Sequence, residues 1–195
     1  MISFLAYILI IVSTRQEVKK NIAIRRLKLN KSNNHEKIFL VIKMNYGAKI
    51  KMLRERNGIT QKELANFIGI DAKLYSHYET EDRIIPCKHL FMISNYFNIS
   101  IDYLFGFNEE KEYKGKINKI INEIEIGKRL KEFRKENKLT QSKLATILNT
   151  AQPVITNYEN GKHLIATPFL YTICKKYHIS ADYLLGKIDN PKYLK

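Results

Sequence analysis

The sequence predicts an all-α protein made of two tandem copies of one five-helix domain, and three observations support this prediction. Residues 47–106 align with residues 127–186 without a gap, and 19 of the 60 aligned positions are identical. Apolar residues recur at helical spacing in both copies, and neither copy shows the sustained two-residue alternation of a strand. A gapless repeat of this length indicates a duplicated domain, because solenoid units are shorter and come in longer series.

The apolar pattern is the same in the two copies. In the first copy the helical positions are Ile50, Leu53, Leu64, Ile68, Leu90, Ile93 and Phe97. In the second copy they are Leu130, Phe133, Leu144, Leu148, Leu170, Ile173 and Tyr177. Such spacing places one apolar face on each helix, as a small helical core requires.

The second helix of each copy has clear boundary signals. Thr60 and Thr140 are expected to cap its start, and Glu63 completes a capping box in the first copy only. The helix is expected to end at Gly69 in one copy and at Asn149 in the other. These residue types tolerate a left-handed backbone, so a sharp turn can follow.

The remaining helices follow from similar signals. A short third helix is expected over residues 72–79 and 152–159. Thr167, followed by proline, is expected to cap the fourth helix of the second copy. Ser100 and Ser180 are expected to cap a fifth helix, which a glycine then ends.

These signals divide the chain into five parts. The expected parts are an N-terminal segment (1–43), a first domain (44–106), a linker (107–126), a second domain (127–186) and a C-terminal tail (187–195). The linker ends in an apolar rhythm formed by Ile117, Ile120, Ile121 and Ile124. That stripe could lengthen the first helix of the second copy, making the linker partly helical, or it could pack the two copies together.

The N-terminal segment has three interpretations. Residues 2–12 form an apolar run of about half the length that a membrane-spanning helix needs. The leading interpretation is that translation starts at Met44 and that residues 1–43 are upstream sequence read in frame. The alternatives are a weak interfacial membrane anchor and a disordered or partner-binding arm. No function is assigned to the segment, and a membrane partner is not expected.

The charge of the chain points to a polyanionic partner. The formal net charge is +15, of which +7 lies in residues 1–43, +1 in 44–106, −1 in 107–126 and +8 in 127–195. Such an excess is typical of proteins that bind nucleic acid or an anionic surface. The two cysteines have no metal-ligand spacing and fit a reduced, cytoplasmic protein.

Both copies share motifs that resemble those of one known family. Each copy contains the pattern T-Q-x-x-L-A, then a turn, and later I-S-x-D-Y-L-x-G, and the second copy adds Y-E-N-G-K from Tyr158 to Lys162. The two copies resemble the phage repressor and Cro-like (XRE-type) helix-turn-helix family, and the resemblance covers about 120 of the 195 residues. It implies two lambda-repressor-like domains and double-stranded DNA as the partner.

The resemblance also implies which residues meet DNA, because the third helix of such domains lies in the major groove. Gln61 and Gln141 would donate to phosphate oxygens at the start of the second helix. The expected base-reading positions are Gln152, Pro153, Thr156 and Asn157 in the second copy and Ala72, Lys73, Ser76 and His77 in the first. The neighbouring Leu74, Tyr75, Tyr78, Val154, Ile155 and Tyr158 are expected to pack. Any of the exposed residues could instead be merely solvated.

The loop after the third helix distinguishes the copies. The second copy has Asn160, a glycine and Lys162, which suit close approach to phosphate. The first copy has Glu81 and Asp82, two carboxylates where a phosphate should pass. Repulsion of this kind weakens the electrostatic part of DNA affinity. The second copy is therefore expected to be the stronger DNA reader.

The predicted function is a sequence-specific DNA-binding transcriptional regulator, specifically a repressor that occludes polymerase. It would act as a homodimer or as an intramolecular pseudo-dimer on an asymmetric site. The alternative is a protein-interaction or dimerisation module in which the first copy has lost DNA binding. The sequence contains no catalytic constellation, phosphate-cradling glycine loop or metal-spaced cluster, so neither enzyme activity nor a cofactor is expected.

Overall fold

The computed structural model describes residues 44–109, 112–113 and 117–191, and the predictions made for residues 1–43 lie outside this part of the chain. The first copy contains α2 (Tyr46–Arg56), α3 (Gln61–Ile68), α4 (Ala72–Glu79), α5 (Cys87–Tyr96) and α6 (Ile101–Phe105). The second contains α7 (Glu123–Glu136), α8 (Gln141–Ile147), α9 (Gln152–Glu159), α10 (Thr167–Tyr177) and α11 (Ala181–Leu184). The all-α prediction is confirmed, since the only extended pairing among the described residues is a single bridge between Ile99 and Glu112.

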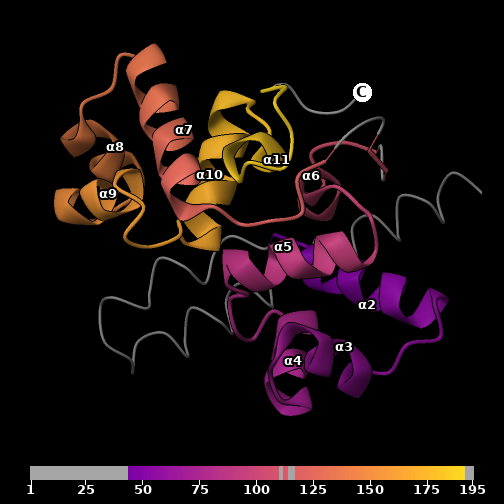
Figure 1. The fold of residues 1–195 in the computed structure, drawn as a ribbon. Helices are drawn as coiled ribbons and strands as arrows, with labels where there is room; N and C mark the ends of the chain where they lie inside the picture. The colour runs from indigo at the N-terminus through magenta and orange to yellow at the C-terminus, as the bar shows by residue number, and fades with distance from the viewer. Residues whose placement is uncertain (1–43, 110–111, 114–116, 192–195) are drawn as a thin grey trace, which may run out of the picture. The chain divides into compact units, whose positions relative to one another are not determined.

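The second and third helices of each copy lie against one another across a tight turn (Figure 1). The third helices, α4 and α9, have the bounds that the sequence predicts. Gly69 ends α3 with φ of 76°, and Asn149 follows α8 with φ of 51°. Both are left-handed, so the turn predicted from these two residue types is present in both copies.

Most predicted helix caps are present. The Thr60 hydroxyl accepts from the Glu63 amide within a complete capping box, and the Thr140 hydroxyl accepts from the amide of Lys143. Ser100 and Ser180 cap α6 and α11 by accepting from the amides of residues 103 and 183. These bonds satisfy amides that a helix leaves without an internal partner.

One predicted cap is wrong. Thr167 is the first residue of α10 and does not cap it; Ala166 occupies the cap position without a side-chain bond. The Thr167 hydroxyl instead donates to the carbonyl of Ile85 in the first copy and lies 3.4 Å from the Cys87 Sγ atom. The Thr167 side chain, which the local sequence predicts to cap α10, is therefore used in a contact with the first copy.

Of the four isoleucines of the linker stripe, Ile124 alone lies in a helix. Helix α7 starts at Glu123, so it is 14 residues long where α2 has 11. Ile120 and Ile124 are each 74% exposed, so neither packs in the core. The first helix of the second copy is therefore longer by three residues, but Ile117, Ile120 and Ile121 precede it, so neither interpretation of the whole stripe is confirmed.

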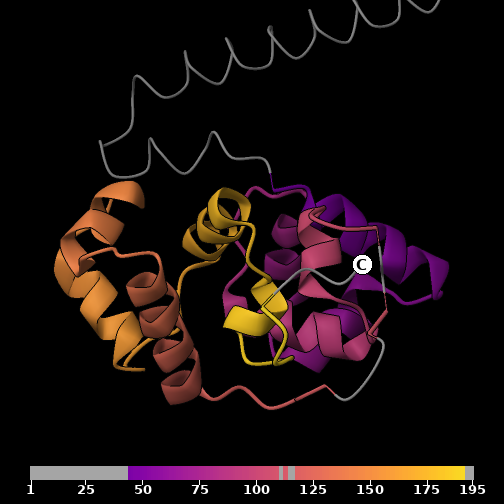
Figure 2. The same ribbon diagram turned by 90° about the horizontal axis from the view of Figure 1, so that it is seen from above.

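The two copies belong to one compact unit of the chain and lie beside one another (Figure 2). They contact each other through equivalent residues, 80 positions apart. The Asp182 carboxylate accepts from the amides of Ile101 and Asp102, each at 3.0 Å. The Asp102 carboxylate accepts from the Ala181 amide at 2.7 Å and from the Ser180 hydroxyl at 2.5 Å. Each copy thus caps the last helix of the other, as expected of an approximate two-fold relationship.

These aspartates are buried with exposures of 0%. Burial, and then the nearby carboxylate of Asp182, raise the pKa of Asp102 well above its usual range. The hydrogen bonds that the pair accepts from the opposite copy offset part of the cost of burying it. Aromatic packing continues the interface, with the ring of Phe105 lying edge-on to Tyr171 at a centroid distance of 5.3 Å.

Candidate nucleic-acid interface

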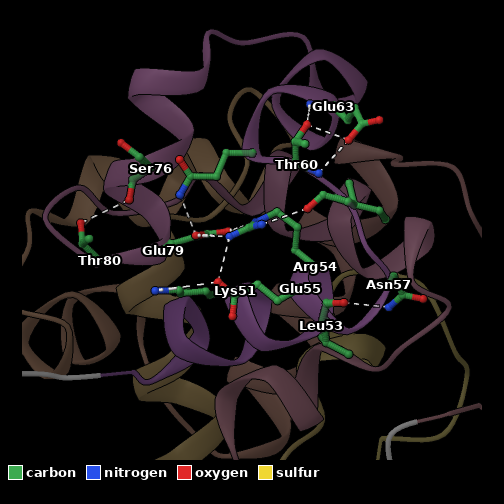
Figure 3. Close-up of polar contacts among 12 residues, drawn as sticks. Lys51, Leu53, Arg54, Glu55, Asn57, Thr60, Glu63, Ser76, Glu79 and Thr80 are labelled. Carbon is green, nitrogen blue, oxygen red and sulfur yellow. Dashed lines mark hydrogen bonds and ion pairs between the residues drawn. The ribbon is translucent and has the colours of Figure 1, made fainter.

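A buried ion pair holds the helix-turn-helix of each copy to its first helix. In the first copy, Arg54 donates from Nε to Glu79 Oε1 at 2.6 Å and from Nη2 to Oε2 at 3.1 Å (Figure 3). In the second copy, Arg134 makes the same two bonds to Glu159 at 2.5 and 2.9 Å. Such bidentate pairs fix geometry as well as adding energy. They set where α4 and α9 lie relative to α2 and α7.

Each carboxylate of these pairs is almost wholly enclosed, with side-chain exposures of 2% for Glu79 and 1% for Glu159. Burial alone would raise the pKa of Glu79, but the hydrogen bonds from Arg54 and Gln61 outweigh it and the net shift is downward. The pKa of Glu159 is lowered in the same way, against the effect of burial, by bonds from Arg134 and Gln141. Both carboxylates are therefore held in the charged form.

The glutamines predicted to meet phosphate are joined to this ion pair. The Gln61 amide donates from Nε2 to Glu79 Oε2 at 2.8 Å, and Gln141 donates to Glu159 Oε2 at 2.9 Å. A carboxylate can only accept, so this bond fixes the amide with nitrogen inward and oxygen outward. One N–H of each glutamine is thus committed inside the protein. The phosphate contact predicted for both residues stays a prediction.

On the second copy the outward oxygen of Gln141 organises the start of α9. It accepts from Gln152 Nε2 at 2.8 Å and from Thr156 Oγ1 at 3.1 Å. Gln152 also donates to Thr156 Oγ1 at 3.2 Å. Three of the predicted DNA contacts therefore form one polar cluster across α8 and α9, with Gln152 and the adjacent Pro153 exposed.

On the first copy the equivalent positions do not form this cluster. Ala72 replaces Gln152 and has no polar side chain, and the hydroxyl of Ser76 donates to the carbonyl of Lys73 at 2.8 Å. Lys73 is exposed, and His77 lies 3.8 Å from Asp82 through its Nδ1 atom. The structure therefore places the predicted first-copy residues on one helix without linking them to Gln61.

The residues predicted to pack behind these surfaces are in part deeply buried. Tyr75, Tyr78 and Ile155 are 0%, 3% and 0% exposed. Leu74, Val154 and Tyr158 are only half-buried. Asn157, predicted to read bases, is half-buried, and its carbonyl accepts from the Lys162 amide at 3.0 Å.

The structure corrects the prediction that two carboxylates face phosphate in the first copy. The Glu81 carboxylate accepts from the amide of Gly47, at the start of α2, at 3.0 Å. It is therefore engaged in capping its own domain. Asp82 is exposed and accepts from the Thr80 hydroxyl at 2.7 Å. One carboxylate, rather than two, stands where the second copy has the exposed Lys162.

The glycine of the second-copy loop has a packing role within the protein. Gly161 has φ of 67°, and a Cβ atom there would lie 2.8 Å from Ile124 Cα and 2.9 Å from the Glu123 carbonyl oxygen. The extra turn of α7 therefore lies too close to residue 161 for a side chain, and the approach to phosphate predicted for this loop stays a prediction. Asn160 and Lys162, on either side of this glycine, are exposed.

The sequence reasoning did not identify the arginines that organise both sites. Arg54 and Arg134 are equivalent, and so are Glu79 and Glu159. Identity of charged residues in two otherwise divergent copies is the signal that could have found them. Among the described residues, no group of three or more potential metal ligands occurs, and none of their helices combines the length and apolar character needed to cross a bilayer.

Comparison with known proteins agrees with the geometry. Residues 50–104 match a family described as helix-turn-helix, and residues 127–190 match a second, described as a helix-turn-helix domain. The chain is 38% identical over 82 residues to the HTH-type transcriptional regulator ImmR of Bacillus subtilis, covering 41% of this chain and 65% of that protein. It therefore spans just under two thirds of the length of ImmR.

Two further relatives show how far the likeness extends. The uncharacterized HTH-type transcriptional regulator YqaE of Bacillus subtilis is 29% identical over 103 residues, which are 52% of this chain and 89% of that protein. Antitoxin PezA of Streptococcus pneumoniae is 35% identical over 68 residues, which are 34% of this chain and 43% of that protein. With its helices and both family matches in register, this chain contains two tandem helix-turn-helix domains, over residues 50–104 and 127–190.

Proposed function

We propose that this protein is a sequence-specific DNA-binding transcriptional regulator in which α9 of the second copy is the main reader of bases. The observation that carries the proposal is the polar cluster of Gln141, Gln152 and Thr156, which holds the Gln152 amide in place on an exposed surface. A glutamine amide can bond bidentately to adenine in the major groove, and Gln152 would do so by exchanging one of the two N–H bonds that it makes within the cluster for a bond to the base. Asn157 and Pro153 would add contacts beside it.

Charge supports the same assignment. Residues 127–195 carry +8, whereas residues 44–106 carry +1. At the equivalent position of the loop after the reading helix, the second copy exposes Lys162 and the first exposes Asp82. A lysine there attracts phosphate and an aspartate repels it. The main electrostatic contribution would therefore come from the second copy, with Asn160 close to the same phosphate.

The contacts between the copies support an intramolecular pseudo-dimer. The reciprocal aspartate caps give the chain both halves of a two-fold arrangement without a second molecule. Because the reading residues of α4 and α9 differ, the site would be asymmetric. Bound near a promoter, such a protein would repress transcription by occluding polymerase. The likeness to proteins named as transcriptional regulators supports a regulatory role.

The alternative applies to the first copy alone. Its α4 lacks the polar cluster, and Asp82 is unfavourable for phosphate. On this view the first copy would serve as a scaffold for the second, through the contacts at Asp102 and Asp182, and would read no bases. Lys73, Ser76 and His77 would then be solvated residues without a ligand.

The experiment is selection of binding sites from random double-stranded DNA with the full chain, followed by affinity measurements on the selected site. Gln152→Ala with Asn157→Ala should weaken binding roughly tenfold or more and relax one part of the site. Lys73→Ala with His77→Ala should relax the base preference at a different part of the DNA site if α4 reads bases. If the alternative holds, these changes should relax no part of the site. Failure of the unaltered protein to enrich any sequence would exclude sequence-specific DNA binding.

A charge exchange provides the matched control. Lys162→Asp should weaken binding to all DNA sequences and reduce the slope of affinity against salt, whereas Asp82→Lys should do the reverse. Neither change should alter which bases are selected, because phosphate contacts carry no sequence information directly. A change in base preference with Lys162→Asp would contradict the assigned role of this residue.

A further inference from the structure

Lys187, the first residue of the C-terminal tail, is buried between the two copies with an exposure of 1%. Its Nζ atom donates to Ser94 Oγ at 2.5 Å and to Asn95 Oδ1 at 2.8 Å, both on α5 of the first copy. The ammonium also lies over the ring of Phe91, 4.8 Å from its centroid. A buried lysine needs such partners, because removing an ammonium from water is costly.

The equivalent residue of the first copy is Phe107, and it makes the reciprocal contact. Its ring lies 5.1 Å from that of Tyr171 on α10, which is the equivalent of Phe91. In each copy, the residue that follows the last helix by one glycine therefore packs against the other copy. The contact is symmetric in position but not in chemistry, since one copy offers a cation and the other a phenyl ring.

The surfaces that receive these residues differ as well. Where Lys187 meets Ser94 and Asn95, the equivalent positions of the second copy are Cys174 and Lys175. If two second copies paired in this geometry, each Lys187 would face a thiol and another ammonium. A thiol is a weak acceptor and an ammonium accepts nothing, so the buried charge would lose both bonds and gain a repulsion. Two-fold symmetry would repeat this cost on the other side.

The polar caps at the centre of the interface do not discriminate in this way. Asp102 and Asp182 are identical and equivalent, and so are the serines that begin the last helices. These groups would serve any pairing of copies equally well. A preference for pairing the second copy with the first copy, and not with another second copy, must come from positions where the copies differ. Lys187 is a buried charge at one of these positions.

We propose that Lys187 selects the pairing partner: it directs the second repeat to the first repeat and prevents it from pairing with the second repeat of another molecule. Specificity of this kind needs an element that is unfavourable in the wrong complex. The repulsive element is the meeting of Lys187 with Lys175. The selection concerns the protein alone and does not depend on DNA binding.

The test separates the copies after folding, because tethering favours pairing within one chain whatever the interface. A protease site is inserted between Lys114 and Gly115 of the full chain, and the purified protein is cut and analysed by native mass spectrometry. The unaltered cut protein should give the one-to-one pair of fragments and no dimer of the C-terminal fragment. Lys187→Met should bring that dimer to roughly tenfold or more above the detection limit, whereas Lys176→Met, at an exposed lysine of α10, should not.

A second variant tests the same idea with Lys187 in place. Cys174→Ser with Lys175→Asn gives the second copy the partners that Lys187 has on the first, so the C-terminal fragment should now form dimers. The proposal is wrong if the unaltered C-terminal fragment already dimerises. It is equally wrong if neither variant produces this dimer while circular dichroism shows that the uncut variants are folded, or if the fragments of every protein separate into monomers.

Discussion

The loops that follow α4 and α9 show how two copies of one domain have diverged around a shared arginine–glutamate–glutamine framework. Both copies keep the arginine–glutamate pair and its glutamine, with bond lengths that differ by no more than 0.2 Å. At the next turn the first copy places Glu81 on the start of α2, and the second has Gly161 beneath a longer α7. The same space is filled by a side chain in one copy and by main chain in the other.

The framework and the surface therefore respond to different constraints. A buried charged pair cannot lose one member cheaply, so the two copies retain both. A surface loop tolerates substitution if its backbone groups find partners. Glu81 in the first copy and the extra turn of α7 in the second each complete the start of the first helix. The loop residue that faces outward is Asp82 in the first copy and Lys162 in the second.

The largest expected effect tests whether the shared framework is equally important in both copies. Arg54→Met and Arg134→Met should each lower the free energy of unfolding by about 3–5 kcal/mol, because either change leaves a buried carboxylate without its partner. Urea unfolding measures the effect. Lys51→Met, which removes a 3.9 Å pair between residues more than half exposed, is the control and should cost about 0–1 kcal/mol. A much smaller loss in one copy would break the equivalence of the two.

The next effect concerns the position where the copies carry Phe107 and Lys187. Burial lowers the pKa of Lys187 to about 8 from 10.5. Between these values the unfolded chain binds the proton and the folded chain does not, so stability should rise with pH, by about 3 kcal/mol over the interval. Lys187→Met should remove this rise and be the more stable protein at neutral pH.

Urea unfolding at a series of pH values between about 7 and 10.5 measures the difference between the two proteins. Other titrating groups cancel in that difference, because both proteins contain them. Phe107→Leu, at the equivalent position, should leave the pH dependence unchanged. A constant difference between Lys187→Met and the unaltered protein across the range would show that Lys187 is not titrating in the interior.

A smaller effect tests why the loops differ. Gly161→Ala should cost about 2 kcal/mol, because a left-handed backbone alone costs about 1–2 kcal/mol for alanine and the new Cβ would also displace α7. Gly58 is the matched control, since its φ of 66° is nearly the same but a Cβ atom there would have no other atom within 4 Å. Gly58→Ala should therefore cost only the backbone contribution. Equal losses in thermal unfolding would show that α7 adjusts freely.

Much of each domain could be predicted from local residue chemistry. The bounds of α4 and α9, the caps at Thr60, Thr140 and Ser100 and the left-handed turns depend on residues within a few positions of each other. Their energies are set by short-range bonds that a sequence displays directly. The helix-turn-helix arrangement followed from these elements and from the family motifs.

The contacts that local chemistry could not reveal are those made across the chain. Thr167 has the residue type and position of a cap, but its hydroxyl bonds to Ile85. Lys187 stands after a glycine in a polar tail, and only the packing of the other copy makes it buried. Glu81 was expected to face outward because the sequence does not show that the start of α2 lies beside it.

The reciprocal aspartate caps have a consequence for the order in which the protein is made. Helix α6 has its first amides bonded to Asp182, a residue 80 positions beyond Asp102 in the chain. At about 5–20 residues per second, synthesis supplies that carboxylate roughly 4–16 seconds after Asp102. During this interval the Ser100 cap of α6 can form, but the amides of Ile101 and Asp102 lack the partner that Asp182 provides. Because of the duplication, the polar contacts of the first domain are complete only after the second domain has been synthesised.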